Sequence, residues 1–448
     1  MSESRLGDWS IVRTTILGAT LLLMSTTAAG QARFHVDAAA LPGGDGLGWN
    51  TAFQSVNTAL TTAAIGDSIW VKAGTYTTGD PSDLADPRSA SFRVAPGITL
   101  RGGFDGTEAT LDDRAGLFES TILTGDLGVP GDPTDNAYHV VQAMFDSGIP
   151  PGPTRVDGFV IRDGNANAPL NSQGGGVMMF NSGLYLSNCI IRNNSARFGG
   201  GVHGQPALIR MSWCQLIDNH AIERGGGLWG QAINYKISHT IFRGNTSDKG
   251  GGAFIQSIGD DNGVSLPIVF FHNSVFYDNH ANRGGAVFIG GTPFASGKAS
   301  FSSCTIAYNQ ADESGGGIFA NTLSQVPAES YLYNSIVWGN TAPISPNLRG
   351  RHSAIACNIQ NGAFYGARNL SADPLFADGP NGDLHLLTGS PATDRGINSL
   401  VPADFADVNT NGDFFEVQTF DLDRTRRFKK ADGSLVTEQV IDMGAFEL

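Results

Sequence analysis

The stretch CQLIDNHAIERGGGL, residues 214–228, decides the fold, because variants of it recur along the chain. IIRNNSARFGGGV occupies residues 190–202, and FYDNHANRGGAV occupies residues 276–287. Each copy carries an apolar residue three positions before an asparagine, a small residue two positions after that asparagine, and then a glycine cluster. The clusters begin at residues 174, 199, 225, 250, 284 and 315. The basic spacing of about 25 residues is typical of a solenoid, and insertions stretch it in places.

Aligning the copies on the repeated asparagine gives columns of like residues. The asparagines are Asn194, Asn219, Asn245, Asn279, Asn309 and Asn340. Eight positions earlier stand Leu186, Met211, Ile237, Phe271, Phe301 and Leu332, and three positions earlier stand Ile191, Leu216, Phe242, Phe276, Ile306 and Val337. Five positions earlier the residues are all small: Cys189, Cys214, Thr240, Ser274, Cys304 and Ser335. The columns predict a common core.

Short segments with a period of two residues, separated by glycine and asparagine, predict three short strands in each turn. Stacked turns would pair as parallel strands about 4.8 Å apart and bury the apolar columns. Asparagine and glycine are expected at the corners, where the chain needs left-handed backbone angles. The sequence therefore predicts an all-β protein, a right-handed parallel β-helix with an N-terminal helical cap and a C-terminal module of strands and loops.

The chain divides into four parts on its sequence. Residues 1–30 have the pattern of a signal peptide, with arginines ahead of an apolar run at 16–24 and small residues after it. Residues 31–95 form the N-terminal cap and first strands, with a helix-like apolar spacing at Phe53, Val56 and Leu60 and a strand at 68–72. Residues 96–345 hold the repeats, and residues 346–448 hold the last turns and the C-terminal module.

The apolar run near the N-terminus is too short to cross about 30 Å of hydrocarbon, so no transmembrane segment is expected in the mature chain. We expect a secreted protein or one on the bacterial cell surface. A formal net charge of −14 argues against nucleic acid as a partner. Of the four cysteines, Cys189 and Cys214 should stack on consecutive turns as free thiols, although their spacing also permits a disulfide.

Three motifs resemble known families. GGAV at 284–287, with FRGN and FYDN ending at Asn245 and Asn279, resembles the polymorphic outer-membrane protein repeat. Residues 49–76 resemble the entry of pectin-lyase-like β-helix proteins. CNIQ, DPLF, GDLHLLTGSPATDRG and DMGAFE, between residues 357 and 447, are similar to the "choice-of-anchor" module of large secreted surface proteins. These resemblances imply the fold and export, but hardly an activity, because the fold carries lyases, hydrolases, adhesins and structural proteins.

The strand after each glycine cluster offers a candidate binding face. One of its columns is aliphatic, and the next contains Trp229, Phe254, Phe288 and Phe319. Since neighbouring residues of a strand point to opposite faces, we expect the aromatic column to face outward, where it could stack on sugar rings. The alternative is that these rings face the core. Long insertions at 256–267, 290–298 and 320–329 follow this strand, and Asp260 and Asp261 in the first of them would add acceptors for a ligand.

The tail contains one motif with the spacing of metal ligands. Asp407, Asn409, Asn411 and Asp413 stand two residues apart, with Glu416 able to complete the shell. Oxygen ligands around a glycine turn favour Ca²⁺, so this loop is a candidate calcium site. The alternatives are a solvated turn, or pairing of the carboxylates with Arg424, Arg426 and Arg427.

No catalytic constellation is recognisable in the sequence. Asp218 and Asp278 stand at expected corners, where solvated turn residues are common, and the row Arg224, Lys249 and Arg283 has acidic neighbours. We therefore favour a protein of the adhesin type that binds a glycan or another cell-surface partner. The alternatives are a polysaccharide lyase or glycoside hydrolase, which the fold alone suggests, and a structural spacer.

Overall fold

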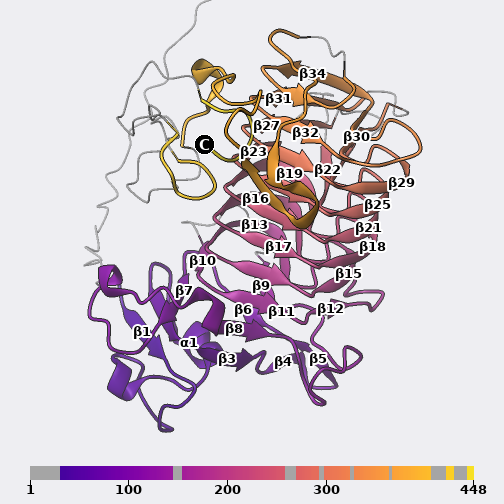
Figure 1. The fold of residues 1–448 in the computed structure, drawn as a ribbon. Helices are drawn as coiled ribbons and strands as arrows, with labels where there is room; N and C mark the ends of the chain where they lie inside the picture. Colours follow the sequence, from indigo (N-terminus) through magenta and orange to yellow (C-terminus); the bar gives the residue numbers. More distant parts are fainter. Residues whose placement is uncertain are drawn as a thin grey trace, which may run out of the picture. The chain divides into compact units, whose positions relative to one another are not determined.

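The computed structural model describes residues 31–144, 154–257, 269–291, 297–322, 327–362, 366–404, 420–427 and 441–448. Within these ranges the chain is an all-β parallel β-helix, as the repeat predicts (Figure 1). Strands from successive turns form three long parallel sheets, and two short antiparallel hairpins stand beside them. No helix in the described ranges is long and apolar enough to span a membrane.

The first and largest sheet has seventeen strands. They are β1 (Arg33–Val36), β2 (Ser68–Lys72), β6 (Phe92–Arg93), β7 (Thr99–Phe104), β9 (Val141–Met144), β10 (Thr154–Asp157), β13 (Val177–Ser187), β16 (Val202–Ser212), β19 (Leu228–Ser238), β22 (Ala253–Ser257), β23 (Val269–His272), β26 (Val287–Gly290), β27 (Lys298–Ser302), β30 (Ile318–Ala320), β31 (Glu329–Tyr333), β33 (Leu348–Arg349) and β34 (Arg351–Ile355).

The second sheet has ten strands and the third has six. The second contains β3 (Gly74–Thr77), β8 (Thr121–Thr124), β11 (Val160–Arg162), β14 (Ile190–Arg192), β17 (Gln215–Ile217), β20 (Ile241–Arg243), β24 (Val275–Tyr277), β28 (Thr305–Ala307), β32 (Ile336–Trp338) and β35 (Asn358–Ile359). The third contains β12 (Asn165–Ala166), β15 (Ser195–Phe198), β18 (His220–Arg224), β21 (Thr246–Lys249), β25 (His280–Arg283) and β29 (Gln310–Ser314).

The remaining elements are short. The hairpins are β4 (Pro81–Asp83) with β5 (Asp86–Ala90), and β36 (Phe376–Asp378) with β37 (Asp383–Leu386). The helical elements are α1 (Val56–Thr62), η1 (Trp49–Thr51), η2 (Leu111–Asp113), η3 (Phe118–Ser120), η4 (Gly379–Asn381) and η5 (Asn398–Leu400). The predicted strand at 68–72 is β2, and α1 buries Val56, Ala59 and Leu60.

From β10 to β29 the turns of the β-helix visit the three sheets in the same order. In one turn β16 is followed by β17 and β18, and the chain then returns to the first sheet as β19. β13, β16 and β19 are single strands of 11 residues, whereas in later turns an insertion divides the same path into two strands, such as β22 and β23. The first sheet therefore has two halves, and the half nearer the glycine clusters carries the candidate site.

The predicted core columns all point inward. The residues three and eight positions before each repeated asparagine are at most 1 % exposed, and they join one continuous cluster. The register matches the alignment, since Leu216 of β17 pairs with Ile191 on one side and Phe242 on the other. The small column is also inward. All four cysteines are buried and free, as expected for stacked thiols, and burial raises the pKa of Cys214, with an added contribution from the neighbouring Cys189.

The role expected for the repeated asparagines is wrong. The left-handed corner residue is the one before each of them, as in Asn193, Asp218 and Asp278 with φ between 53° and 55°. The repeated asparagines instead point into the core and bond to one another. Nδ2 of Asn219, for example, donates to Oδ1 of Asn245 at 3.0 Å. At the bend, where strand pairing is interrupted, buried backbone N–H and C=O groups need hydrogen-bond partners. The short amide of asparagine can both donate to and accept from these groups, whereas an apolar side chain can do neither.

The described parts of the C-terminal module pack alongside the turns (Figure 1). Its contacts follow the corner that leads from the first sheet into the second. Arg424 donates to Oδ1 of Asn188 at 3.0 Å, and Nδ2 of Asn334 donates to the carbonyl oxygen of Ile397 at 3.0 Å. The module is thus bound to the solenoid over several turns.

Candidate functional site

A single outward column runs along the half of the first sheet that follows the glycine clusters. Strand pairing places one residue from each turn directly beside the next. In spatial order the column is Arg93, Gln142, Met178, His203, Trp229, Phe254, Phe288, Phe319 and Arg349. The column changes from polar at β6 and β9 to aromatic in the middle turns, so its two regions have different chemistry.

The aromatic region is a stack of rings outside the solenoid core. Trp229, Phe254, Phe288 and Phe319 form a hydrophobic cluster of their own, separate from the core cluster. Phe288 lies with its ring centroid 5.1 Å from that of Phe254 and 4.9 Å from that of Phe319, nearly parallel to both. Parallel strands in register bring like side chains to this spacing.

The expected exposed aromatic face is not open. The four side chains are only 4–9 % exposed. Two residues of the third sheet help to cover them, because the bend at the glycine cluster brings this sheet close to the stacked rings. The ring of Phe198 lies 6.3 Å from that of Trp229, and the guanidinium of Arg224 lies 5.3 Å from the ring of Phe254. A ligand-binding role for the four rings therefore stays a prediction, and the small exposed fraction of their side chains does not favour it.

His203 joins the aromatic and polar regions. Its ring stacks on Trp229 with centroids 4.4 Å apart and an interplanar angle of 8°. Among the described residues, neither ring nitrogen of His203 has a hydrogen-bond partner, and the same is true of Nε1 of Trp229. Burial lowers the pKa of His203 to about 3, so the imidazole is neutral at physiological pH and acts here as a flat, weakly polar stacking partner.

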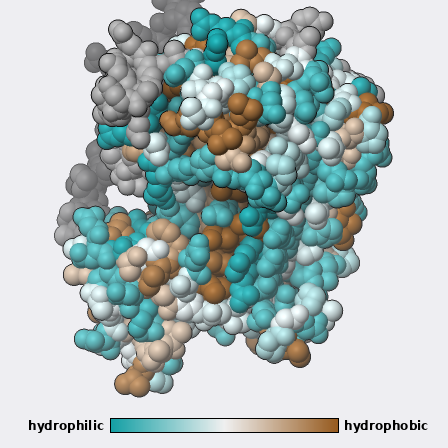
Figure 2. Space-filling model, in the orientation of Figure 1, coloured by the Kyte–Doolittle hydropathy of each residue, from teal (hydrophilic) through white to brown (hydrophobic). Residues whose placement is uncertain are grey.

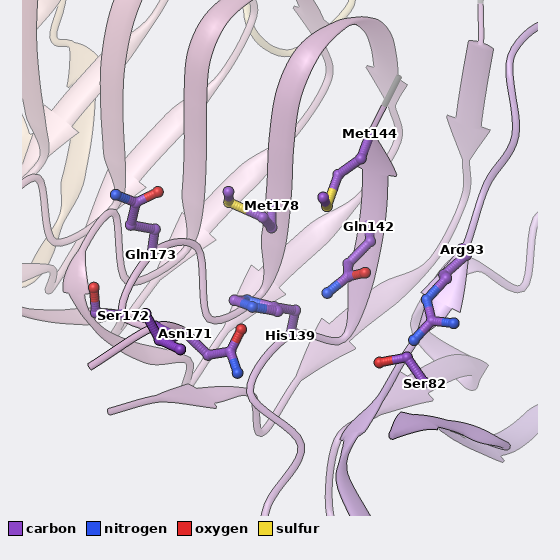
Figure 3. Close-up of a pocket in the computed structure, with 10 residues that line it drawn as sticks. Ser82, Arg93, His139, Gln142, Met144, Asn171, Ser172, Gln173 and Met178 are labelled. Atoms are coloured by element: carbon purple, nitrogen blue, oxygen red, sulfur yellow. The ribbon is translucent and has the colours of Figure 1, made fainter. Parts of the chain in front are cut away.

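A pocket of about 360 Å³ lies over the polar region of the column (Figure 3). Arg93, Gln142 and Met178 of three successive strands contribute to its lining. Figure 3 shows Arg93 and Ser82 on one side, and the segment 171–173 on the other, with Gln142 and His139 between them. Three stretches of the chain, 82–93, 139–144 and 170–178, thus meet at one pocket.

Most polar groups of the pocket are neutral. They are the carboxamides of Gln142, Asn171 and Gln173, the hydroxyls of Ser82 and Ser172, and the imidazole of His139. His139 is buried, which lowers its pKa, and Nδ1 lies 2.9 Å from the carbonyl oxygen of Gly174. Because that oxygen can only accept, Nδ1 carries the proton, and Nε2 is left as an acceptor.

Among the described residues that line the pocket, Arg93 is the one that carries a charge. Its side chain is exposed, and Nη2 donates to the carbonyl oxygen of Ser89 at 3.2 Å. Among the described residues Arg93 forms no ion pair. Most of its guanidinium donors are consequently available to an anion in the pocket.

Apolar side chains form the rest of the lining. Met178 is half-buried in the column, whereas Met144 and Leu170 are 50 % and 97 % exposed. The space-filling view shows hydrophobic surface in the middle of the face that carries β9 and β13, with hydrophilic surface around it (Figure 2). Such a mixture of apolar surface and convergent polar groups is typical of small-molecule sites, and the volume lies at the lower end of their range.

The other predicted site residues fall outside the described ranges. Asp260 and Asp261, like the whole candidate calcium loop at Asp407, Asn409, Asn411, Asp413 and Glu416, are among them. In the ranges that the structure describes, no three His, Cys, Asp or Glu residues come together as metal ligands would. Calcium binding remains a prediction.

The basic row also has a simple structural explanation. Arg224, Lys249 and Arg283 lie in register on the third sheet, as their alignment predicts. Lys249 pairs with Asp248 at 3.0 Å, and Arg283 pairs with Glu313 at 2.5 Å. Exposed pairs of this kind contribute under about 1 kcal/mol each and indicate a solvated surface.

Sequence reasoning missed the pocket, although part of the signal was present. AYHVVQA at 137–143 reads as apolar alternation, and Val141 pairs with Val177 of the aliphatic column. Extending the alignment by that one turn would have placed Gln142 beside Met178. Ser82 and the segment 171–173 carry no such periodic mark, so only the folded chain brings them to this site.

Comparisons with known proteins add little to the assignment. No protein-family model matches the chain. A segment of 175 residues, 38 % of the chain, is 28 % identical to the metabotropic glutamate receptor-like protein R of Dictyostelium discoideum. The match spans only 8 % of that protein's length.

Proposed function

We propose that this protein is a secreted or cell-surface carbohydrate-binding protein of the adhesin type, with its binding site in the pocket over Arg93, Gln142 and Met178. The observation that carries the proposal is the composition of the lining, in which carboxamides and hydroxyls converge on apolar side chains. A sugar ring presents hydroxyls around its edge and C–H groups on its faces. Carboxamides both donate and accept hydrogen bonds, so they can match hydroxyls of either polarity.

The scaffold supports this role because it holds the site rigidly. Arg93, Gln142 and Met178 stand on paired strands, and the stacked rings from His203 to Phe319 extend the same face without gaps. Sites on strands keep their geometry better than sites on loops, which reduces the ordering cost of binding. The partial likeness to a receptor-like protein is compatible with a surface location.

Simple binding suits the pocket better than glycoside hydrolysis. Most glycosidases need two carboxyl groups flanking the scissile bond, one of them as an acid. None of the ten described residues that line the pocket is Asp or Glu. The lining therefore favours recognition without turnover at this site.

A glycan array probed with the purified mature chain tests the proposal. We expect selective binding to a small set of glycans, and Gln142→Leu should weaken it at least fivefold by removing one amide from the lining. Gln215→Leu is the matched control, because Gln215 stands on the second sheet, outside the pocket, and should bind as the wild type does.

Two results would contradict the proposal. Absence of binding to any glycan would remove the carbohydrate ligand, and equal weakening by both glutamine variants would remove the pocket as its site. Incubation of the bound glycan with the protein should release no new reducing ends and no unsaturated product. Release of either would support the alternative of a hydrolase or a lyase.

A further inference from the structure

We infer that the pocket selects a sugar that carries both a carboxylate and an N-acetyl group. The inference rests on the proposed carbohydrate-binding function and specifies its ligand class. It is drawn from the way in which charge, amides and apolar surface are divided across the pocket (Figure 3).

The carboxylate is assigned to Arg93. Among the described residues, this guanidinium is the one charge in the lining and has no carboxylate partner. It faces the pocket from the β6 side (Figure 3). A guanidinium binds a carboxylate through two parallel hydrogen bonds, a geometry that a neutral hydroxyl cannot reproduce. The chain as a whole has a formal net charge of −14, whereas the one charge among the described lining residues is positive.

The net negative charge does not cancel this attraction. At physiological ionic strength, exposed charges more than about 8 Å apart are largely screened from one another. A carboxylate in direct contact with Arg93 would respond mainly to that contact and to the neutral groups around it.

The N-acetyl group is assigned to the side of the pocket away from Arg93. There Asn171 and Gln173 contribute carboxamides to the lining, and Leu170 contributes an apolar side chain. Met178 lies between Gln173 and Gln142 (Figure 3). An acetamido group combines an amide, which needs a donor and an acceptor, with a methyl group, which needs apolar contact. The Leu170 side chain is 97 % exposed, so it is free to cover such a methyl group.

The side of the pocket that carries Arg93 lies at the edge of the sheet. β6 is the edge strand of this half of the sheet, since among the described strands its one pairing is with β9. Ser82 of the β4–β5 hairpin lines the pocket on that same side. Arg93 and Ser82 therefore form one end of the site.

Calorimetric titration with four methyl glycosides separates the two groups. Glucose carries neither group, N-acetylglucosamine carries the acetamido group, glucuronic acid carries the carboxylate, and N-acetylneuraminic acid carries both. The last should bind the full mature chain at least tenfold more tightly than either singly substituted sugar. Arg93→Gln should remove the gain in affinity that the carboxylate gives to the two acidic probes and leave binding of N-acetylglucosamine unchanged. Leu170→Ser should remove the gain in affinity that the acetamido group gives and leave binding of glucuronic acid unchanged.

The matched controls are Arg243→Gln and Leu84→Ser, which change exposed residues outside the pocket lining. Both should bind all four probes as the wild type does. Equal affinity for the four probes, or acidic-probe affinity that survives Arg93→Gln, would overturn the inference while leaving the carbohydrate-binding proposal intact. Failure to bind any of the four probes, together with an empty glycan array, would overturn both.

Discussion

Nδ2 of Asn245 donates a hydrogen bond to Oδ1 of Asn279 at 2.9 Å, and both side chains are buried in the core of the solenoid. This pair is one step of a ladder that runs from Asn194 to Asn340, in which each side chain bonds to the next turn and to a nearby backbone carbonyl. The ladder fixes the register of the second and third sheets at the bend between them, where strand pairing is interrupted.

Asn245→Ala should therefore destabilise the protein strongly. Oδ1 of Asn245 accepts from the backbone N–H and from Nδ2 of Asn219, and Nδ2 of Asn245 donates to the carbonyl oxygen of Leu216. The truncated side chain would therefore deprive the buried N–H of Asn219 and the carbonyl oxygen of Leu216 of these partners. We expect a loss of roughly 2–4 kcal/mol in denaturant unfolding. Asn282→Ala, on the exposed side of the neighbouring turn, should change stability by less than about 0.5 kcal/mol. Equal effects of the two variants would contradict a structural ladder.

The aromatic stack is expected to act mainly in stability. Phe288 is 5 % exposed and lies between two parallel rings, so Phe288→Ala should cost roughly 3–5 kcal/mol. Phe180→Ala, which removes a ring that is 40 % exposed on the same sheet, should cost much less. If the Phe288→Ala protein folds with normal stability but loses glycan binding, the aromatic stack is a binding surface and the expectation is wrong.

The first glycine of each cluster should not tolerate a side chain. Gly225 has φ of 65°, and a Cβ there would lie 2.2 Å from the carbonyl oxygen of Leu228, which belongs to the backbone and cannot move aside. Gly116 is the control, since its φ of 73° is similar but nothing lies within 4 Å of a Cβ. Gly116→Ala should cost only about 1–2 kcal/mol for the left-handed conformation, whereas Gly225→Ala should cost clearly more in thermal unfolding.

The C-terminal module should loosen as the pH rises. Burial raises the pKa of Glu447 from 4.5 to about 8, although the side chain pairs with the fully buried Arg427 at 2.8 Å. The folded module thus holds a proton that the unfolded chain releases above pH 4.5, so this contribution to stability is complete below pH 4.5 and is lost as the pH rises toward 8. Burial also raises the pKa of Asp442, in the same direction.

Hydrogen exchange of residues 441–448 measured between pH 5 and 9 checks this expectation, after correction for the intrinsic rate. Protection should fall toward alkaline pH in the wild type. It should vary less in Glu447→Gln, which keeps the size of the side chain and removes its charge. Protection that rises with pH would mean that Glu447 is ionised and stabilised by Arg427.

The four cysteines should remain unreactive in the native protein. All are buried as free thiols, and burial raises the pKa of Cys304 and of Cys357 to about 12, which suppresses the reactive thiolate. Titration with a thiol reagent should detect no thiol before denaturation and four thiols after it. Detection of only two in the denatured chain would reveal a disulfide between stacked turns.

The sequence by itself determined the repeat and its core. Leu216, Phe242 and Phe276 align from their spacing alone because each turn must bury the same position, and a period of two residues shows which side of a strand points inward. The strand at 68–72 and the apolar face of α1 were predictable for the same reason. These features depend on near neighbours in the sequence and on exact repetition.

Only the tertiary structure decided the remainder. The direction of Asn219 could not be read from its type, because asparagine suits both a left-handed corner and a buried amide ladder. The exposure of Trp229 depends on Phe198 and on other groups that fold over it, and the pocket joins Ser82, Gln142 and Gln173 from separate turns. Burial and pocket shape arise from contacts between distant segments, whose positions depend on insertion lengths and packing that no local pattern encodes.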